Sequence, residues 1–162
     1  MGGLSATIIA SSPLRALAQT GAHSIAHDFP SLRTRALPWH QLLEPERVQI
    51  LFGEETEFAG SSPLNEESRL GTYICAACFL PLFRSQHKYN SGTGWPSFTQ
   101  PIETHIVTRQ DFRRVEYHCA RCLGHQGHVF DDGPPPRGER WCNNGLALLF
   151  IPATEPLPRL RP

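Results

Sequence analysis

Two C-x-x-C pairs constrain this chain more than any other feature. Cys75-Ala-Ala-Cys78 and Cys119-Ala-Arg-Cys122 are separated by the 40 residues 79–118. Each two-residue spacer lets both sulfurs of a pair face one ion, and four thiolates complete the tetrahedral coordination of Zn²⁺. A closed four-cysteine site leaves no open position for a reacting group, so the spacing predicts one structural zinc that joins two hairpins. The alternatives are two disulfides or four buried thiols, and a single C-x-x-C is also a redox motif.

The length and composition describe an ordinary globular chain. Its 162 residues suffice for one domain with its own core. Apolar residues make up 40% and charged residues 19%, as in folded soluble domains. The 15 basic and 15 acidic residues balance, so we expect no nucleic-acid partner. No run approaches the roughly 20 apolar residues of a membrane helix, so we expect no membrane span.

The chain divides into a leader at 1–37, a domain at 38–152 and a proline-rich tail at 153–162. In the leader, a mildly apolar run ends at Ala16-Leu17-Ala18, a small-x-small pattern typical of a signal cleavage site. No basic residue precedes this run. We interpret it either as an export signal without its first residues or as a disordered leader or frayed helix. The first hypothesis predicts an exported or periplasmic protein, and the second predicts a cytoplasmic one.

The local patterns predict a mainly β domain with a short helical part before it. Residues 38–52 have helical spacing, with Pro45 in a first turn and Gly53 as the stop. Residues 54–70 read as an ordered loop. From residue 71 onward, short β-branched or aromatic runs alternate with turn residues, which is typical of strands. The expected strands are 72–75, 82–85, 106–108, 114–118, 128–130 and 146–151.

The fifth cysteine, Cys142, has no partner in this scheme. In an extended strand it shares a face with Arg140 and Asn144, because residues i and i+2 point the same way. A nucleophilic cysteine must be a thiolate, which a nearby positive charge stabilises. Cys142 is therefore a candidate nucleophile in a pocket with Arg140 and Asn144. The alternative is a small buried apolar residue, because free cysteine is among the most buried residue types.

Two further motifs carry candidate functional side chains. His125-Gln126-Gly127-His128 precedes Asp132, and paired histidines supply protons near neutral pH. These histidines are alternatively metal ligands or surface residues. The second motif, Ser91-Gly92-Thr93-Gly94-Trp95-Pro96-Ser97-Phe98, suggests a loop that exposes Trp95, for which the alternative is a core position.

Taken together and in this order, the motifs resemble the methionine-R-sulfoxide reductase family, also known as the SelR domain. The resemblance covers about residues 38–152. The matching stretches are Gly71–Cys78, Pro81–Phe83, Ser91–Phe98, Arg114–Glu116, Cys119–Cys122, His125–Pro134 and Gly138–Asn144. The resemblance implies a small zinc-pinned fold of antiparallel sheets, of the Mss4-like or β-tent type, with a short N-terminal helical part.

The resemblance also implies an activity and a role for each site residue. The implied reaction is reduction of the R epimer of methionine sulfoxide in oxidised proteins, with no organic cofactor. Cys142 would be the nucleophile and would become a sulfenic acid. His125 and His128 would supply protons to the departing oxygen, and Asn144 would contact that oxygen. Arg140 and Asp132 would organise the charge around the site. Trp95 and Phe130 would form an apolar pocket for the substrate.

One departure from the family changes the expected redox cycle. Many members carry a second cysteine in the G-x-G-W loop, where this chain has Thr93. An internal disulfide with Cys142 cannot form at that position. We therefore expect thioredoxin or another external thiol to reduce the sulfenic acid. A cysteine taken from the zinc site is the alternative. The resemblance further suggests a monomer.

Two other function classes remain as hypotheses. The same scaffold with inactive chemistry would be a zinc-pinned binding module. Against that hypothesis, a pure binder has no need for Cys142, Arg140 and Asn144 together with two histidines. A general thiol oxidoreductase would act through a C-x-x-C pair. The metal content of the protein distinguishes this last class from the other two, because four cysteines bound to zinc cannot cycle as dithiols.

Overall fold

The computed structural model describes residues 38–161. Two α-helices come first, α1 (Trp39–Leu42) and α2 (Pro45–Gly53). Nine strands follow, namely β1 (Gly71–Cys75), β2 (Pro81–Arg84), β3 (Lys88–Tyr89), β4 (Ser97–Phe98), β5 (Ile106–Asp111), β6 (Arg114–Cys119), β7 (His125–Phe130), β8 (Arg140–Asn143) and β9 (Leu148–Pro152). Short 3₁₀ turns lie at Pro63–Asn65, Ser85–His87, Glu103–His105 and Gly145–Ala147. The leader 1–37, with its proposed cleavage site, lies outside the described residues.

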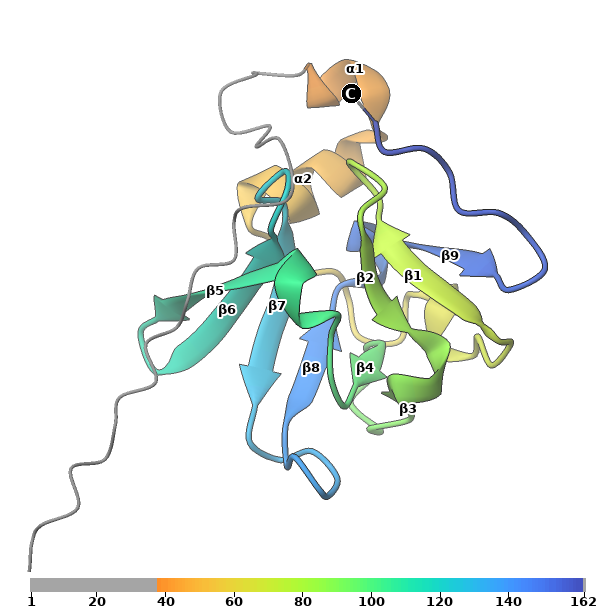
Figure 1. Ribbon diagram of the computed structural model, residues 1–162. Helices are drawn as coiled ribbons and strands as arrows, with labels where there is room; N and C mark the ends of the chain where they lie inside the picture. Colours follow the sequence, from red (N-terminus) through yellow and green to blue (C-terminus); the bar gives the residue numbers. More distant parts are fainter. Residues whose placement is uncertain (1–37, 162) are drawn as a thin grey trace, which may run out of the picture.

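The strands form two antiparallel sheets. One has the order β2-β1-β9 and the other has the order β3-β4-β8-β7-β6-β5. The two helices lie together beyond one end of the sheets, and the C-terminal segment returns to the same end (Figure 1). The expected mainly β domain of antiparallel sheets with a short N-terminal helical part is confirmed.

The predicted helical segment 38–52 contains two short helices, and the predicted place of Pro45 in a first turn is confirmed. The chain leaves the helical conformation at Leu43, and α2 begins only at Pro45. A proline disfavours the α conformation of the residue before it, so Glu44 is extended and the helix restarts with Pro45 in its first turn. Helix α2 ends at Gly53, one residue beyond the predicted segment. Gly53 is still helical, and Glu54 adopts the left-handed conformation with φ 56°.

The strand predictions were right in position but incomplete. β5 extends to Asp111 and β7 begins at His125, so both strands are longer than predicted. The expected strand 146–151 begins only at Leu148, after a 3₁₀ turn. β3 and β4 were not among the predicted strands, whereas β8 is the strand in which Arg140 and Cys142 were expected. β3 and β4 have two residues each and are partly polar, so their strand character comes from pairing with neighbours and not from a local pattern.

A cluster of aromatic rings fills the space between the two sheets. Phe83 of β2 stacks on Phe98 of β4 with ring centroids 4.1 Å apart, and Tyr73 of β1 meets Phe98 edge-on at 4.9 Å. Tyr117 of β6 contacts Phe83 and Trp141 in the same edge-on way. Full burial of one large apolar side chain stabilises a fold by about 1.5–3 kcal/mol. The cluster therefore fixes the smaller sheet against the larger one.

Helix α2 closes one end of this core. Its buried residues are Ile50 and Leu51. Gly124 lies so close to Leu51 that a side chain at position 124 would collide with it. Arg47 donates to the carbonyl oxygens of Leu146 and, at 3.1 Å, Leu148. The helix is thus tied to the C-terminal strands as well as to the second C-x-x-C turn.

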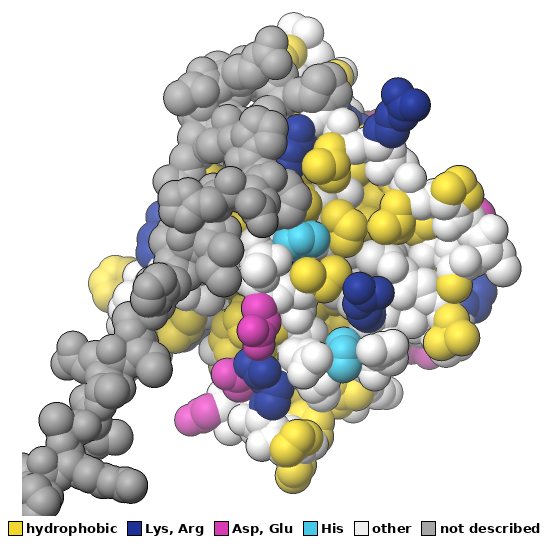
Figure 2. Space-filling view, in the orientation of Figure 1, with side chains coloured by type: hydrophobic (Ala, Val, Ile, Leu, Met, Phe, Trp, Pro, Cys, Tyr) yellow, Lys and Arg dark blue, Asp and Glu magenta, His cyan; other side chains and the backbone are white. Residues whose placement is uncertain are grey.

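On the face shown in Figure 2, acidic and basic side chains are interspersed with hydrophobic ones. Within residues 38–161, no helix has the length and apolar character needed to cross a bilayer. Residues 153–161 of the tail form no strand or helix but are attached to the domain. The backbone N–H of Arg161 donates to the Cys78 carbonyl at 3.1 Å, and its guanidinium lies over the Phe79 ring at 4.3 Å.

Candidate active site and metal centre

The two C-x-x-C turns have the same backbone geometry. In the first, the Phe79 N–H donates to the Cys75 carbonyl at 2.9 Å, and in the second Leu123 donates to Cys119 at 2.9 Å. Phe79 and Leu123 both have positive φ, 66° and 60°. Cys75 ends β1 and Cys119 ends β6, so each sheet delivers one pair. The prediction that the two pairs meet is confirmed.

The four sulfurs are placed to hold a metal ion. One ligand atom from each of the four cysteines lies within 4.8 Å of the others. The Cys75 and Cys122 sulfurs are 3.6 Å apart, and those of Cys78 and Cys119 are 3.5 Å apart. A disulfide requires about 2.05 Å, whereas tetrahedral thiolates 2.3 Å from one ion are about 3.8 Å apart. The observed spacing fits metal coordination, and all five cysteines, which lie within the described residues, are free.

The surroundings of the cluster support a shared negative charge. Hydrogen bonds from Cys119 and the two other thiols lower the pKa of Cys78, while burial raises the pKa of Cys119. The Gln126 side chain donates to the Cys75 sulfur at 3.7 Å. A metal ion would supply the positive charge that several buried thiolates need. The donor set of four sulfurs therefore fits a closed structural metal centre.

Cys142 lies apart from this cluster, in β8, an inner strand of the larger sheet. His128 of β7 is its cross-strand neighbour on one side, and Ser97 of β4 is its neighbour on the other. A cavity of about 150 Å³ opens over it. The cavity is lined by Thr56, Trp95, Arg114, Gly127, His128, Phe130, Cys142, Asn143 and Asn144. Four of the predicted site residues besides Cys142 thus meet at one hollow, namely Trp95, His128, Phe130 and Asn144.

A glycine brings the strands close enough for this meeting. Gly127 pairs with Asn143, and any side chain at position 127 would collide with the Cys142 carbonyl oxygen. The absence of a side chain at Gly127 therefore lets β7 and β8 pair beside the candidate nucleophile. The cavity floor requires this close approach.

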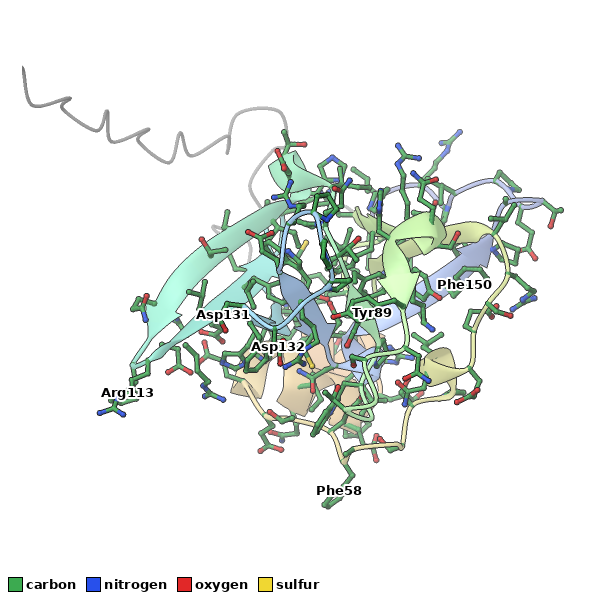
Figure 3. The ribbon with its side chains drawn as sticks, turned by 90° about the horizontal axis from the view of Figure 1, so that it is seen from below. Phe58, Tyr89, Arg113, Asp131, Asp132 and Phe150 are labelled. Carbon is green, nitrogen blue, oxygen red and sulfur yellow. The ribbon has the colours of Figure 1, made fainter. Side chains whose placement is uncertain are left out.

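The charge around Cys142 comes from Arg140 and Asp132. Burial raises the pKa of the Cys142 thiol, whereas Arg140 and a hydrogen bond from Thr93 lower it. The Arg140 guanidinium donates twice to Asp132, at 2.7 and 2.9 Å, and lies 4.2 Å from the centre of the Phe130 ring. The hydrogen bonds of Arg140 hold the pKa of Asp132 below its usual range. Arg140 and Asp132 thus form a fixed pair beside the thiol, and Asp132 lies near Tyr89 in the view from below (Figure 3).

The two histidines occupy different positions. His128 lines the cavity, and its Nε2 lies 3.1 Å from the Asp111 carboxylate. His125 is 1% exposed and does not line the cavity. Its ring is 5.6 Å from the His128 ring, centroid to centroid. His125 therefore reaches the cavity only through His128.

A buried carboxylate lies behind His125. Glu116 Oε1 is 2.5 Å from His125 Nδ1, and Glu116 also accepts from Arg109 at 2.6 and 3.1 Å. Burial opposes ionisation of Glu116, but the hydrogen bonds of Arg109 and the nearby His118 give it a lowered pKa. Burial also lowers the pKa of His125, although Glu116 acts in the opposite direction. The arrangement keeps His125 as a neutral ring that donates from Nδ1.

Asn144 and Trp95 are both held by the loop before β1. Asn144 is extended, directly after β8, and it accepts at Oδ1 from the Glu57 N–H at 3.1 Å. Its amide donates to the Gln126 carbonyl at 3.1 Å. The Trp95 indole donates to the Glu57 carbonyl at 3.1 Å. Trp95 is therefore a partly exposed wall of the cavity and not a core residue.

The sequence analysis gave no role to three acidic residues that organise the site. Glu57 lies in the predicted loop 54–70, which has no periodic signal. Asp111 comes directly before a hairpin turn, and an acidic residue at such a turn gives no signal of a functional role. Glu116 lies in a predicted strand, between Val115 and Tyr117. A single acidic residue between two apolar ones was the signal that could have marked it as functional.

The fold and the site define a β-sheet domain with one cysteine at a cavity and a cluster of four further cysteines placed to hold a metal ion. The sequence model of the SelR domain matches residues 43–152. A peptide methionine sulfoxide reductase MsrB of Leptospira interrogans is 45% identical over 117 residues, which cover 69% of this chain and 89% of the relative. A relative with the same name from Pseudomonas putida (strain W619) is 47% identical over 121 residues, or 70% and 90% of the two chains. One from Agrobacterium fabrum is 41% identical over 128 residues, or 76% and 95%.

The chain therefore belongs to the SelR-domain family of methionine sulfoxide reductases, and it is an oxidoreductase. The resemblance drawn from the sequence motifs is confirmed.

Proposed function

We propose that this protein reduces the R epimer of methionine sulfoxide in oxidised proteins, with Cys142 as the nucleophile. The observation that carries the proposal is the pairing of Cys142 with His128 across β8 and β7 at the floor of the cavity. A thiol and an imidazole opposite one another provide a nucleophile and a proton source at one sulfoxide. The family membership supports the same reaction.

The reaction balances as an oxygen transfer between two sulfurs. The Cys142 thiolate attacks the sulfoxide sulfur, and one proton is added at the oxygen. The sulfur–oxygen bond of the substrate breaks, and a sulfur–oxygen bond forms on Cys142. Methionine leaves with its sulfur reduced by two electrons, and Cys142 becomes a sulfenic acid, which is reversible with a thiol.

Each remaining site residue has a role consistent with its contacts. His128 donates the proton, and Asp111 orients its ring at 3.1 Å. His125 supports His128 from behind, and Asn144 faces the same oxygen from the cavity wall. Arg140, fixed by its two bonds to Asp132, stabilises the thiolate. Trp95 and Phe130 provide the apolar surface for the substrate methyl group.

An external thiol completes the cycle. Thr93 occupies the loop beside Cys142, and the other four cysteines belong to the metal cluster. A first thiol attacks the sulfenic sulfur, forms a mixed disulfide and releases water. A second thiol restores Cys142 and leaves as a disulfide. Thioredoxin or a small thiol would serve as this reductant, and the bound metal is a structural Zn²⁺ ion, as four thiolates select.

We assign this activity to a monomeric domain at 38–152. The test uses the zinc-loaded protein with dithiothreitol and separate R and S epimers of a peptide-linked methionine sulfoxide. Loss of the R epimer alone, abolished in Cys142→Ser, is the expected result. No turnover of either epimer in protein with one bound zinc would refute the proposal and favour the zinc-pinned binding module. Replacement of dithiothreitol by thioredoxin then tests the external reductant.

A further inference from the structure

A second cavity, larger than the one over Cys142, adjoins the candidate active site, and we refer to it as the flanking cavity. Its volume is about 470 Å³, against about 150 Å³ for the cavity over Cys142. Residues from 60–66 line one side of it and residues from 88–96 line the other. Among the described residues, Trp95 alone lines both cavities. A molecule bound at Cys142 therefore meets the flanking cavity as soon as it extends past Trp95.

The pairing of the strands places the flanking cavity on the same face of the larger sheet as Cys142. Tyr89 of β3 lines this cavity and pairs with Ser97 of β4, which in turn pairs with Cys142 of β8. Residues directly opposite one another in an antiparallel sheet point to the same face. Neighbouring strands are about 4.8 Å apart, so Tyr89 and Cys142 are separated by roughly 10 Å on that face. Because β3 is an edge strand, the flanking cavity lies at the edge of the sheet.

This separation suits an extended polypeptide. In an extended chain, the side chains of residues i and i+2 point the same way and are about 7 Å apart. Residue i+1 points the opposite way, and residue i+4 lies about 14 Å away, beyond the flanking cavity. A methionine sulfoxide at Cys142 would therefore bring the side chain two positions along the substrate to the flanking cavity.

The two sides of the flanking cavity are joined by hydrogen bonds. Lys88 Nζ donates to the Asn65 carbonyl at 2.8 Å, and the Asn65 side-chain amide donates to the Gly94 carbonyl at 3.0 Å. The Gly60 N–H donates to the same Gly94 carbonyl at 2.7 Å. These bonds fix the two loops relative to each other. A bound side chain does not have to order them, which removes one of the costs of binding.

Lys88 and Glu66 give the flanking cavity one positive and one negative group. The Lys88 ammonium has three protons and uses one of them on Asn65. Burial lowers the pKa of Lys88, and the carboxylates of Glu66 and Glu67 act in the opposite direction. Glu67 is itself paired with Arg69 at 2.9 Å. The charges that remain for a ligand are those of Lys88 and Glu66, and they cancel.

An uncharged polar side chain matches this pair of groups. An amide both donates and accepts, so glutamine or asparagine can bond the Lys88 ammonium and the Glu66 carboxylate together. An apolar side chain would remove water from both charges without replacing its hydrogen bonds. A charged side chain would meet one group of its own sign.

We propose that the flanking cavity is a substrate subsite, which takes the uncharged polar side chain two residues away from the methionine sulfoxide in an extended polypeptide. Lys88 and Glu66 would set the preference for this side chain and take no part in the chemical step. The proposal rests on the proposed function, because it requires the sulfoxide to be bound at Cys142.

The test uses the zinc-loaded full chain with dithiothreitol and blocked pentapeptides of glycine around a central R-methionine sulfoxide. The residue two positions before or after the sulfoxide is Gly, Gln, Leu, Glu or Lys. At one of these two positions, Gln should give a kcat/KM about five- to tenfold above Gly and Leu, the effect of one to two hydrogen bonds. N-acetyl-methionine sulfoxide amide, which has no flanking residues, is the reference substrate.

Two substitutions should change the preference in opposite directions. Glu66→Gln leaves the charge of Lys88 unbalanced, so the peptide with Glu should become the best substrate. Lys88→Met keeps the length of the side chain without its charge, so the peptide with Lys should become the best substrate. Turnover of the reference substrate should be unchanged in both variants. The matched control, Glu155→Gln, changes an exposed acid in the tail and should keep the preference for Gln.

Equal kcat/KM values for all five side chains at both positions, or a preference for Leu, would overturn the subsite and leave the proposed function standing. An unchanged preference for Gln in Glu66→Gln would also overturn it, as would an equal loss of turnover on the pentapeptides and the reference substrate. If Lys88→Met fails to fold, the exposed Glu66→Gln and the peptide series on the parent protein decide.

The subsite can also be tested without turnover. If no methionine sulfoxide is reduced, the proposed function fails, and calorimetric Kd values for the same pentapeptides with Cys142→Ser then decide the subsite. Binding of the Gln peptide about five- to tenfold tighter than the Gly and Leu peptides would support the subsite. Equal Kd values would overturn it.

Discussion

The backbone N–H of Glu57 donates to the side-chain oxygen of Asn144 at 3.1 Å, across 87 positions of sequence. The Glu57 carboxylate continues the contact, because it accepts from the Gly145 N–H at 2.6 Å and from the Leu146 N–H at 2.8 Å. The loop before β1 therefore caps the end of the strand that carries Cys142. This contact fixes one wall of the active-site cavity.

Glu57→Gln should lower the free energy of unfolding by about 1–3 kcal/mol. An amide has one acceptor oxygen where the carboxylate has two, so one buried N–H loses its charged partner. Urea denaturation of the zinc-loaded protein measures the change, and the exposed neighbour Glu55→Gln serves as the control. A loss below about 0.5 kcal/mol, the range of ordinary surface substitutions, would contradict this prediction.

Gln126→Leu should weaken metal binding with little change in the fold. The Gln126 amide donates to the Cys75 sulfur at 3.7 Å, and leucine has a similar volume without a donor. Partners behind the metal ligands typically contribute 10–100-fold in affinity. Competition for zinc with a chelator of known affinity measures the effect, with the exposed Gln86→Leu as the matched control. Equal zinc affinities for the two variants would show that this contact does not act on the metal.

Chelation of the metal should unfold the domain. Four buried sulfurs join the two sheets, and without an ion they must either take up protons or remain as unpaired charges. We expect loss of near-ultraviolet circular dichroism on treatment with a strong chelator and its recovery when one equivalent of zinc is returned. A metal-free protein with an unchanged spectrum and melting temperature would exclude a structural role for the ion.

His125 should make the protein less stable in mild acid. Burial lowers its pKa below the value of about 6.5 expected in the unfolded chain, with Glu116 partly opposing. Between these two values the unfolded chain binds one more proton than the folded one, so the free energy of unfolding falls as pH falls through this window. A difference of one bound proton changes the free energy of unfolding by at most about 1.4 kcal/mol per pH unit. His125→Gln should reduce the slope measured by urea denaturation between pH 7.5 and 5.5.

The control for this slope is His40→Gln, which changes an exposed histidine on α1. It should keep the pH dependence of the parent protein. Identical slopes for the parent and His125→Gln would mean that His125 binds its proton equally well in both states.

Thr93→Cys should convert the catalytic cycle to one with an internal disulfide. Because Thr93 lies close enough to Cys142 to lower the pKa of its thiol, we expect a sulfur at position 93 to reach the sulfenic acid. After one equivalent of substrate without reductant, the parent should give a dimedone adduct at Cys142. Thr93→Cys should give a 93–142 disulfide and no adduct, whereas Thr108→Cys should behave like the parent. A dimedone adduct of equal yield in Thr93→Cys would place the two side chains too far apart.

The metal cluster and the nucleophile were predictable from local spacing. Two thiolates of a C-x-x-C pair face the same ion because of the turn between them, and the paired motifs need no knowledge of the sheets. Cys142 stood out because the other four cysteines were already assigned. The same local logic failed for β3 and β4, since Lys88–Tyr89 and Ser97–Phe98 are too short to show a period. Only pairing with neighbouring strands makes them extended.

What the sequence by itself determined is the class of chemistry: four sulfurs for one metal, a fifth cysteine for reaction, and histidines close to it in the chain. The tertiary structure decided which of these groups meet. His128 and not His125 lies opposite Cys142, Asp111 and Glu116 orient the two rings, and Glu57 closes the far wall. The physical reason is register, because each of these contacts joins separate strands or loops. A shift of one residue in the pairing would turn every side chain to the other face, and only the packed core fixes that pairing.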